Sequence, residues 1–99
     1  MTMTPLKSEF PLTIDTFPDW AAELAQELEL TVLEREAGAD YHQWLVDFEG
    51  SRLLVCFQHY ADCAWLQPLG GQDEATVAWL TEQWNRTQAG NSLQIKTND

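Results

Sequence analysis

Apolar residues recur along this 99-residue chain with two different periods. Near the start they follow the spacing of one helix face, and this face contains Trp20, Ala21, Leu24 and Leu28. Thr16 is suited to cap such a helix, and Pro18 and Asp19 are suited to its first turn. The pattern therefore predicts a helix that begins at Thr16.

From Thr31 onward the period changes to two, which is typical of strands. The clearest stretch is YHQWLVDFEGSRLLVCFQH, residues 41–59. A two-residue turn with Gly50 before Ser51 fits a type II′ hairpin, and it pairs residues whose numbers sum to 101. This register places His42 opposite His59. The face that it predicts to be buried contains Trp44, Val46, Phe48, Leu53, Val55 and Phe57.

Further strands are predicted over residues 10–14, where Pro11 restricts the strand to an edge, and over residues 31–36 and 62–67. A second helix is predicted from the spacing of Val77, Leu80 and Trp84. The predicted fold is α+β, an antiparallel β-meander of four to five strands with two helices packed on one face.

The predicted domain is flanked by two polar ends. We expect a flexible N-terminal tail over residues 1–9, a single α+β domain over 10–88 and a C-terminal tail over 89–99. Leu93 and Ile95 leave open a final edge strand within that last segment.

The second face of the predicted sheet is not cleanly polar. Leu45, Leu54 and Cys56 lie there among Gln43, Asp47 and Gln58. Two interpretations remain open, contact with a partner or a second copy, and cover by an end segment of the chain.

Charge narrows the classes of partner. The chain has 16 acids, 5 bases and a formal net charge of −11, and ten acids between Asp15 and Glu49 are balanced only by Arg35. Such a field repels phosphate backbones and anionic lipids, so we expect no nucleic acid and no membrane as a direct partner. Asp19, Glu23 and Glu27 follow at intervals of four along the predicted helix. They form either a solvated flank of the helix or a docking stripe for a basic partner.

The compartment is inferred from missing signals. No stretch approaches the roughly 20 apolar residues of a membrane helix, and the N-terminus lacks a basic-then-apolar signal pattern. We therefore expect a cytoplasmic protein whose cysteines stay reduced.

Candidate chemistry centres on CFQHYADC, residues 56–63. His42, Cys56, His59 and Cys63 are the residue types that bind zinc, but the predicted register turns both histidines to one face and Cys56 to the other. A disulfide between the cysteines is geometrically allowed if the two lie opposite each other, although the compartment disfavours it. No nucleophile motif or phosphate loop occurs, so we expect no catalytic residue, no metal and no cofactor.

Three tryptophans occupy predicted core positions, namely Trp20, Trp44 and Trp84. Trp65 and Trp79 do not, and we regard them as candidate exposed anchors for a partner.

The chain resembles a small uncharacterised proteobacterial family of unknown function. The resemblance lies in three stretches, Gly38–Trp44, Phe48–Phe57 with its Phe48-Glu49-Gly50 start, and Tyr60–Leu66. The likeness covers about residues 12 to 87. It implies a bacterial cytoplasmic protein of this length and supplies neither an activity nor site residues.

Three functions follow as hypotheses. The first is a non-enzymatic acidic module that binds a protein partner or forms a homodimer through a sheet face or edge. The second is a small ligand-binding or enzymatic domain with a pocket near His42 and His59. The third is a DNA-mimic antagonist of a basic protein, which would use the acids of the first helix and the first strands.

Overall fold

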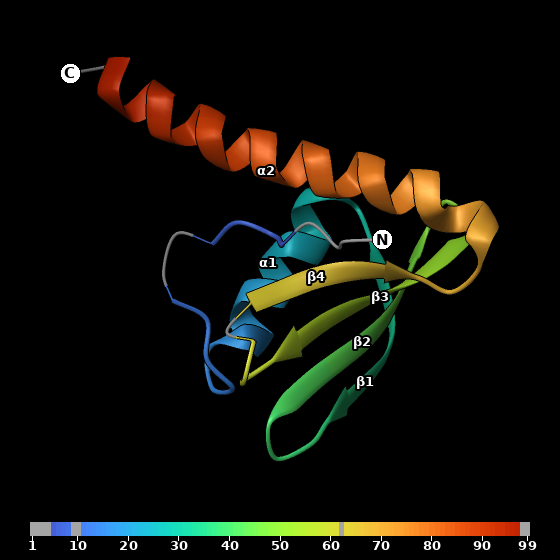
Figure 1. Ribbon diagram of the computed structural model, residues 1–99. Coiled ribbons are helices and arrows are strands. Elements are labelled where there is room, and N and C mark those ends of the chain that lie inside the picture. Colours follow the sequence, from blue (N-terminus) through green and yellow to red (C-terminus); the bar gives the residue numbers. More distant parts are fainter. Residues whose placement is uncertain (1–4, 9–10, 62, 98–99) are drawn as a thin grey trace.

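The computed structural model describes residues 5–8, 11–61 and 63–97. Its elements in chain order are α1 (Phe17–Glu27), β1 (Thr31–Ala37), β2 (Tyr41–Phe48), β3 (Ser51–Gln58), β4 (Cys63–Pro68), the short 3₁₀-helix η1 (Gly71–Asp73) and α2 (Glu74–Thr97). The strands form one antiparallel sheet in the order β1-β2-β3-β4 (Figure 1). The predicted α+β meander is therefore confirmed, with four strands.

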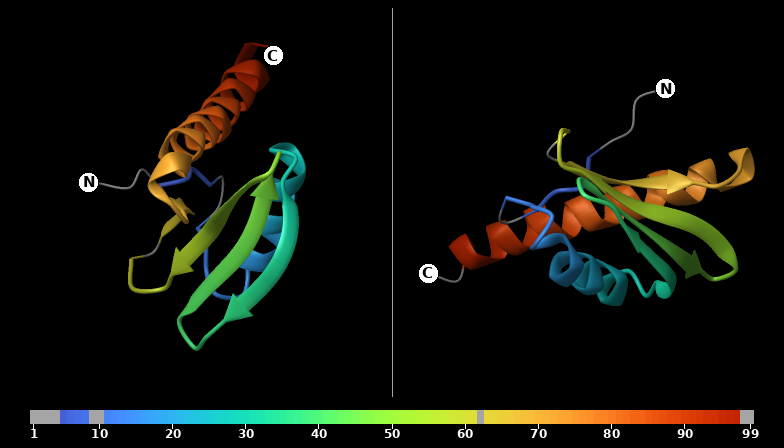
Figure 2. Two further views of the ribbon diagram at one scale, coloured as in Figure 1. Left: turned by 90° about the vertical axis from the view of Figure 1, so that its right-hand side faces the viewer. Right: turned by 90° about the horizontal axis from the view of Figure 1, so that it is seen from below.

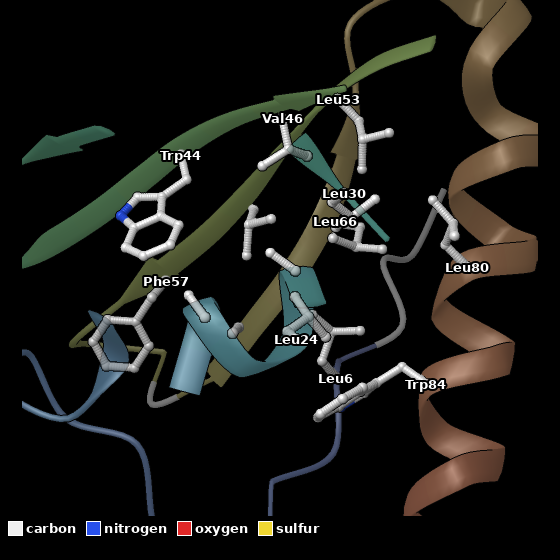
Figure 3. Close-up of a cluster of buried hydrophobic side chains, with 14 of the residues drawn as sticks. Leu6, Leu24, Leu30, Trp44, Val46, Leu53, Phe57, Leu66, Leu80 and Trp84 are labelled. Carbon is white, nitrogen blue, oxygen red and sulfur yellow. The ribbon is translucent and has the colours of Figure 1, made fainter. Parts of the chain in front are cut away.

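One hydrophobic core joins the sheet to both helices. α1 lies behind the sheet as drawn in Figure 1, and α2 runs along the β4 side (Figures 1 and 2). Figure 3 shows side chains from α1, the sheet and α2 converging in this core. Its largest fully buried side chains are Phe17, Phe57, Leu24, Leu53, Leu66, Leu80, Val46 and Val55.

The chain enters α1 through Thr13, three residues before the predicted cap. Thr13 Oγ1 accepts a hydrogen bond from the Thr16 amide at 3.1 Å, and Thr16 Oγ1 accepts one from the Thr13 amide at 2.9 Å. This is the reciprocal arrangement of a capping box. Thr16 is the N-cap residue of α1, as predicted, but its side chain makes no capping bond to the helix, so only the predicted side-chain cap is wrong.

The same turn explains why residues 11–14 do not form the predicted strand. Residue 10 lies outside the described residues, and residues 11–14 are not in a strand. Leu12 is buried on one side of Thr13 and Phe17 on the other, as in a hydrophobic staple. The alternating apolar pattern over 10–14 therefore reflects a helix entry.

The β2–β3 hairpin turns at Glu49 and Gly50, so the predicted register is wrong by two residues. Glu49 has φ 49° and Gly50 has φ 93°, as a type I′ turn requires. Asp47 Oδ1 accepts the Gly50 amide at 3.0 Å, which supports the turn. Phe48 pairs with Ser51, and His42 pairs with Phe57 instead of His59. Because the shift is even, every side chain keeps its predicted face.

Residues 5–7, predicted to belong to a tail, pack on the domain. Leu6 is only 5 % exposed, and its amide donates to the Ala64 carbonyl at 2.8 Å. Asn85 Oδ1 accepts the Lys7 amide at 2.8 Å, and Trp84 Nε1 donates to the Lys7 carbonyl at 2.7 Å. A single apolar residue has no period, so the sequence pattern did not predict this contact.

The predicted C-terminal tail also needs correction. α2 continues to Thr97, so neither a tail from residue 89 nor a strand at Leu93 and Ile95 forms in the described part. Residues 98–99 lie outside it. This stretch includes the helix formers Ala89, Leu93, Gln94 and Lys96 and no proline, and its one glycine costs only about 1 kcal/mol in a helix.

Candidate functional site

The side of the sheet that faces away from α1, here called the open face, is the candidate site. No described helix lies over the strands on this side, which is turned toward the viewer in Figure 1. Side chains alternate along β2, where His42, Trp44 and Val46 are buried and the residues between them are only half-buried.

The centre of the open face is apolar. Leu45 on β2 lies directly opposite Leu54 on β3, and Cys56 on β3 lies directly opposite Trp65 on β4. Leu45, Leu54 and Trp65 are half-buried. The Trp65 indole also donates to Gln67 Oε1 at 3.3 Å on the same strand. The result is an apolar strip across three neighbouring strands.

Cys56 is the only buried member of this strip. Its cross-strand neighbours on the open face are Gln43 and Trp65, both large side chains. Burial raises the pKa of the Cys56 thiol to about 11. The thiolate is therefore scarce at neutral pH, which makes Cys56 unsuited to nucleophilic chemistry.

The two cysteines do not face each other. Cys63 pairs with Gln58, two residues beyond Cys56, so the thiols are diagonal neighbours on one face. Diagonal positions are roughly 7–8 Å apart, beyond the reach of a disulfide. Both cysteines are free, and the opposed pairing considered from the sequence is wrong.

Strand β1 separates its charges between the two faces. Glu34 pairs with Leu45 and Glu36 with Gln43, so both carboxylates lie on the open face. Arg35 pairs with Trp44 on the core side, where its guanidinium carbon lies 4.7 Å from the Trp44 ring centroid. The one base of the acidic segment is thus engaged away from the open face.

The Glu36 carboxylate also interacts with Tyr41. The Tyr41 hydroxyl donates to Glu36 Oε2 at 2.7 Å, and this bond, together with the charge of Glu36, raises the Tyr41 pKa above its ordinary value. A Cβ at Gly38 would lie 2.1 Å from the Tyr41 ring, so glycine is required for this close approach. Glycine at residue 38 therefore lets Tyr41 reach the acid.

The structure does not pair His42 with His59 across the strands. His42 is 8 % exposed, stacks on Phe17 with ring centroids 4.9 Å apart, and has Nε2 at 2.8 Å from the Ile14 carbonyl oxygen. His59 is exposed beyond the end of β3, and its ring lies 5.9 Å from that of Tyr60. A pocket lined by both stays a prediction, now without the cross-strand pairing that suggested it.

The other predicted surface residues lie on different parts of the molecule. Asp19, Glu23 and Glu27 are exposed on α1, on the helix side of the sheet. Trp79 on α2 is 51 % exposed, and its ring lies 5.9 Å from that of Phe48 near the hairpin tip. Of the predicted anchors, the open face includes Trp65 only.

The sequence placed Glu34 and Glu36 among the acids of the hypothetical DNA-mimic surface, but it did not assign them to the open face. The signal was present as the alternation Glu34-Arg35-Glu36 in a strand, which sorts charges by face.

The zinc-type residues are divided between the two sides of the sheet. His42 points into the core, while Cys56 and Cys63 lie on the open face. Within residues 5–8, 11–61 and 63–97, no group of three or more His, Cys, Asp or Glu side chains is arranged to hold a metal ion.

No helix in the described part of the chain is both long and apolar enough to cross a membrane.

These features define a small acidic α+β protein with one helix-covered and one open sheet face. The chain belongs to a family of proteins of unknown function (DUF3630), whose model matches residues 4–85. No curated protein and no solved structure matches the chain. The matched region covers α1, the whole sheet and the first half of α2, so the open face belongs entirely to the family domain.

Proposed function

We propose that this protein is a non-enzymatic, acidic interaction module that binds a partner protein through its open face. The observation that carries the proposal is the apolar strip of Leu45, Leu54 and Trp65, half exposed and bordered by Glu34 and Glu36. An apolar centre with a charged rim is the usual anatomy of a protein interface.

Charge favours a different protein over a second copy as the partner. Each copy has a formal net charge of −11, so two copies repel as they approach. A neutral or basic partner is attracted by the same field, and electrostatic attraction raises association rates most at low salt.

A bacterial cytoplasm is the location that we propose. Cys56 and Cys63 are both free and lie at diagonal positions that a disulfide does not span. This arrangement fits a reducing compartment, where thiols stay unpaired.

The test compares two substitutions of equal charge on opposite sides of the sheet. Leu54→Asp places a carboxylate in the apolar strip, whereas Ala22→Asp places one on the exposed surface of α1. Tagged wild type and both variants are used to capture proteins from the source bacterium, with quantitative mass spectrometry as the readout. We expect one partner to be retained by wild type and Ala22→Asp and reduced at least tenfold with Leu54→Asp, the loss of a buried interface contact worth about 1.4 kcal/mol or more.

Circular dichroism of both variants controls for folding. The proposal is wrong if all three proteins, equally folded, capture the same set in the same amounts.

A further inference from the structure

The edge strand β1 has seven residues, and no described element pairs with its outer side. Among the described strands, β2 is the only neighbour of β1. Six of its seven residues are exposed, and only Val32 is half-buried. Figures 1 and 2 show no described helix or strand beyond this edge. An edge strand of this kind presents unpaired backbone donors and acceptors to any extended chain that approaches it.

The regular part of the edge is short and charged. The pairing with β2 shifts between Val32 and Glu34, which leaves Leu33 in a bulge. Glu34, Arg35 and Glu36 follow, with charges negative, positive and negative. Because successive side chains alternate, the two carboxylates face one side and the guanidinium the other.

This charge order disfavours pairing between two copies. In an antiparallel β1–β1 pair centred on Arg35, Arg35 would face its own copy and Glu34 would face Glu36. All three cross-strand pairs would then join like charges, and like charges directly opposite each other are destabilising. The edge therefore discriminates against self-association, which is a recognised role of charged edge strands.

We propose that the β1 edge docks an extended segment of the partner whose charges run basic, acidic, basic. The backbone of this segment would pair with residues 34–37. Its two basic side chains would lie opposite Glu34 and Glu36 on the open face, and its acidic side chain opposite Arg35. This is strand addition, in which main-chain bonds supply affinity and side chains supply specificity.

The Glu36 carboxylate can accept a hydrogen bond from a basic side chain of the partner in addition to the one from Tyr41. It accepts the Tyr41 hydroxyl through Oε2, and an ionised carboxylate has about four acceptor sites. The proposal rests on the proposed function and names the chemistry of the partner.

The test uses three synthetic peptides with blocked ends. TVKEKVT has the complementary order, KTVETVK has the same composition with its charges separated, and TVEKEVT has the charge order of β1 itself. Titration into ¹⁵N-labelled protein at low salt gives the affinity and the amides that shift. We expect TVKEKVT to shift the amides of residues 31–37 and to bind about fivefold tighter than KTVETVK.

A charge-swapped variant provides the matched control. Glu34→Lys and Glu36→Lys together, on an exposed edge, should reverse the preference from TVKEKVT to TVEKEVT. Equal affinity for TVKEKVT and KTVETVK, no binding of TVKEKVT, or shifts outside β1 would each overturn the proposal. If capture through Leu54 succeeds and these peptide results fail, the interaction function stands and the strand-addition mode is wrong.

Discussion

At the scale of single residues, Cys56 links the open face to the stability of the fold. Its thiol is buried, and burial raises its pKa from 9.0 to about 11. The folded state therefore favours the neutral thiol more strongly than the unfolded state does. A group with a raised pKa contributes stability that is complete below the unfolded pKa and is lost as pH rises through the folded pKa.

We predict that the free energy of unfolding falls between about pH 9 and pH 11, with about 2 kcal/mol of the loss due to Cys56. Cys56→Ala should remove this part of the pH dependence, whatever it does to stability at neutral pH. Cys63→Ala leaves Cys56 in place and should keep it. Urea unfolding of the three proteins at pH 8 and pH 11 measures the difference. Parallel pH profiles for both variants would show that Cys56 is not the source.

At the scale of elements, the sequence predicted which face of a helix or strand each side chain occupies better than it predicted the turns. Helix and strand periods depend on many residues, so the locations of both helices and the buried face of the hairpin were correct, although α2 extends to Thr97. Turns depend on one or two backbone conformations. Glu49 adopts a positive φ, which is unusual for a glutamate and was not predicted. The turn was therefore placed at Gly50 and Ser51, and the predicted register was wrong by two residues.

Two contacts outside the periodic segments were also missed. Thr13 bonds with Thr16 in the turn before α1, but this pair lacks the Glu or Gln that marks a capping box in a sequence. Leu6 is buried beside Trp84 and Asn85, which lie far along the chain and leave no local pattern. For the candidate site, the apolar residues of the open face were predicted. The role of Glu34 and Glu36 depended on knowing that β1 is an edge.

The end of α1 allows a direct test of backbone strain. Glu29 has φ 57° directly after the helix, and the Leu30 amide donates to the Ala25 carbonyl at 2.7 Å, as in a Schellman motif. Glycine occupies such positions without steric cost. We predict that Glu29→Gly raises the free energy of unfolding by roughly 0.5 to 1 kcal/mol.

The control for this prediction removes the same side chain from the helix interior. Glu23 is also exposed and lies within α1, so Glu23→Gly should lower stability by about 1 kcal/mol. Thermal or urea unfolding measures both variants. Destabilisation by both substitutions would show that the positive φ of Glu29 is not strained.

At the scale of the whole molecule, the arrangement of charge distinguishes the hypotheses. The acids of α1 lie on the helix side, whereas Glu34 and Glu36 lie on the open face. This separation disfavours a DNA mimic, which needs the acids of the first helix and first strands on one continuous surface. It leaves the open face with an apolar centre and with Glu34 and Glu36 along its β1 side, which suits a protein partner with apolar and basic contacts.

The most direct measurement is photo-crosslinking in living cells of the source bacterium. A benzophenone amino acid replaces Leu54 on the open face or, as control, Ala22 on α1. We predict a discrete covalent adduct with another protein from position 54 and none from position 22. Equal adducts from both positions, no adduct from position 54, or an adduct formed only by two copies of this chain would contradict the claim that the open face binds a partner protein.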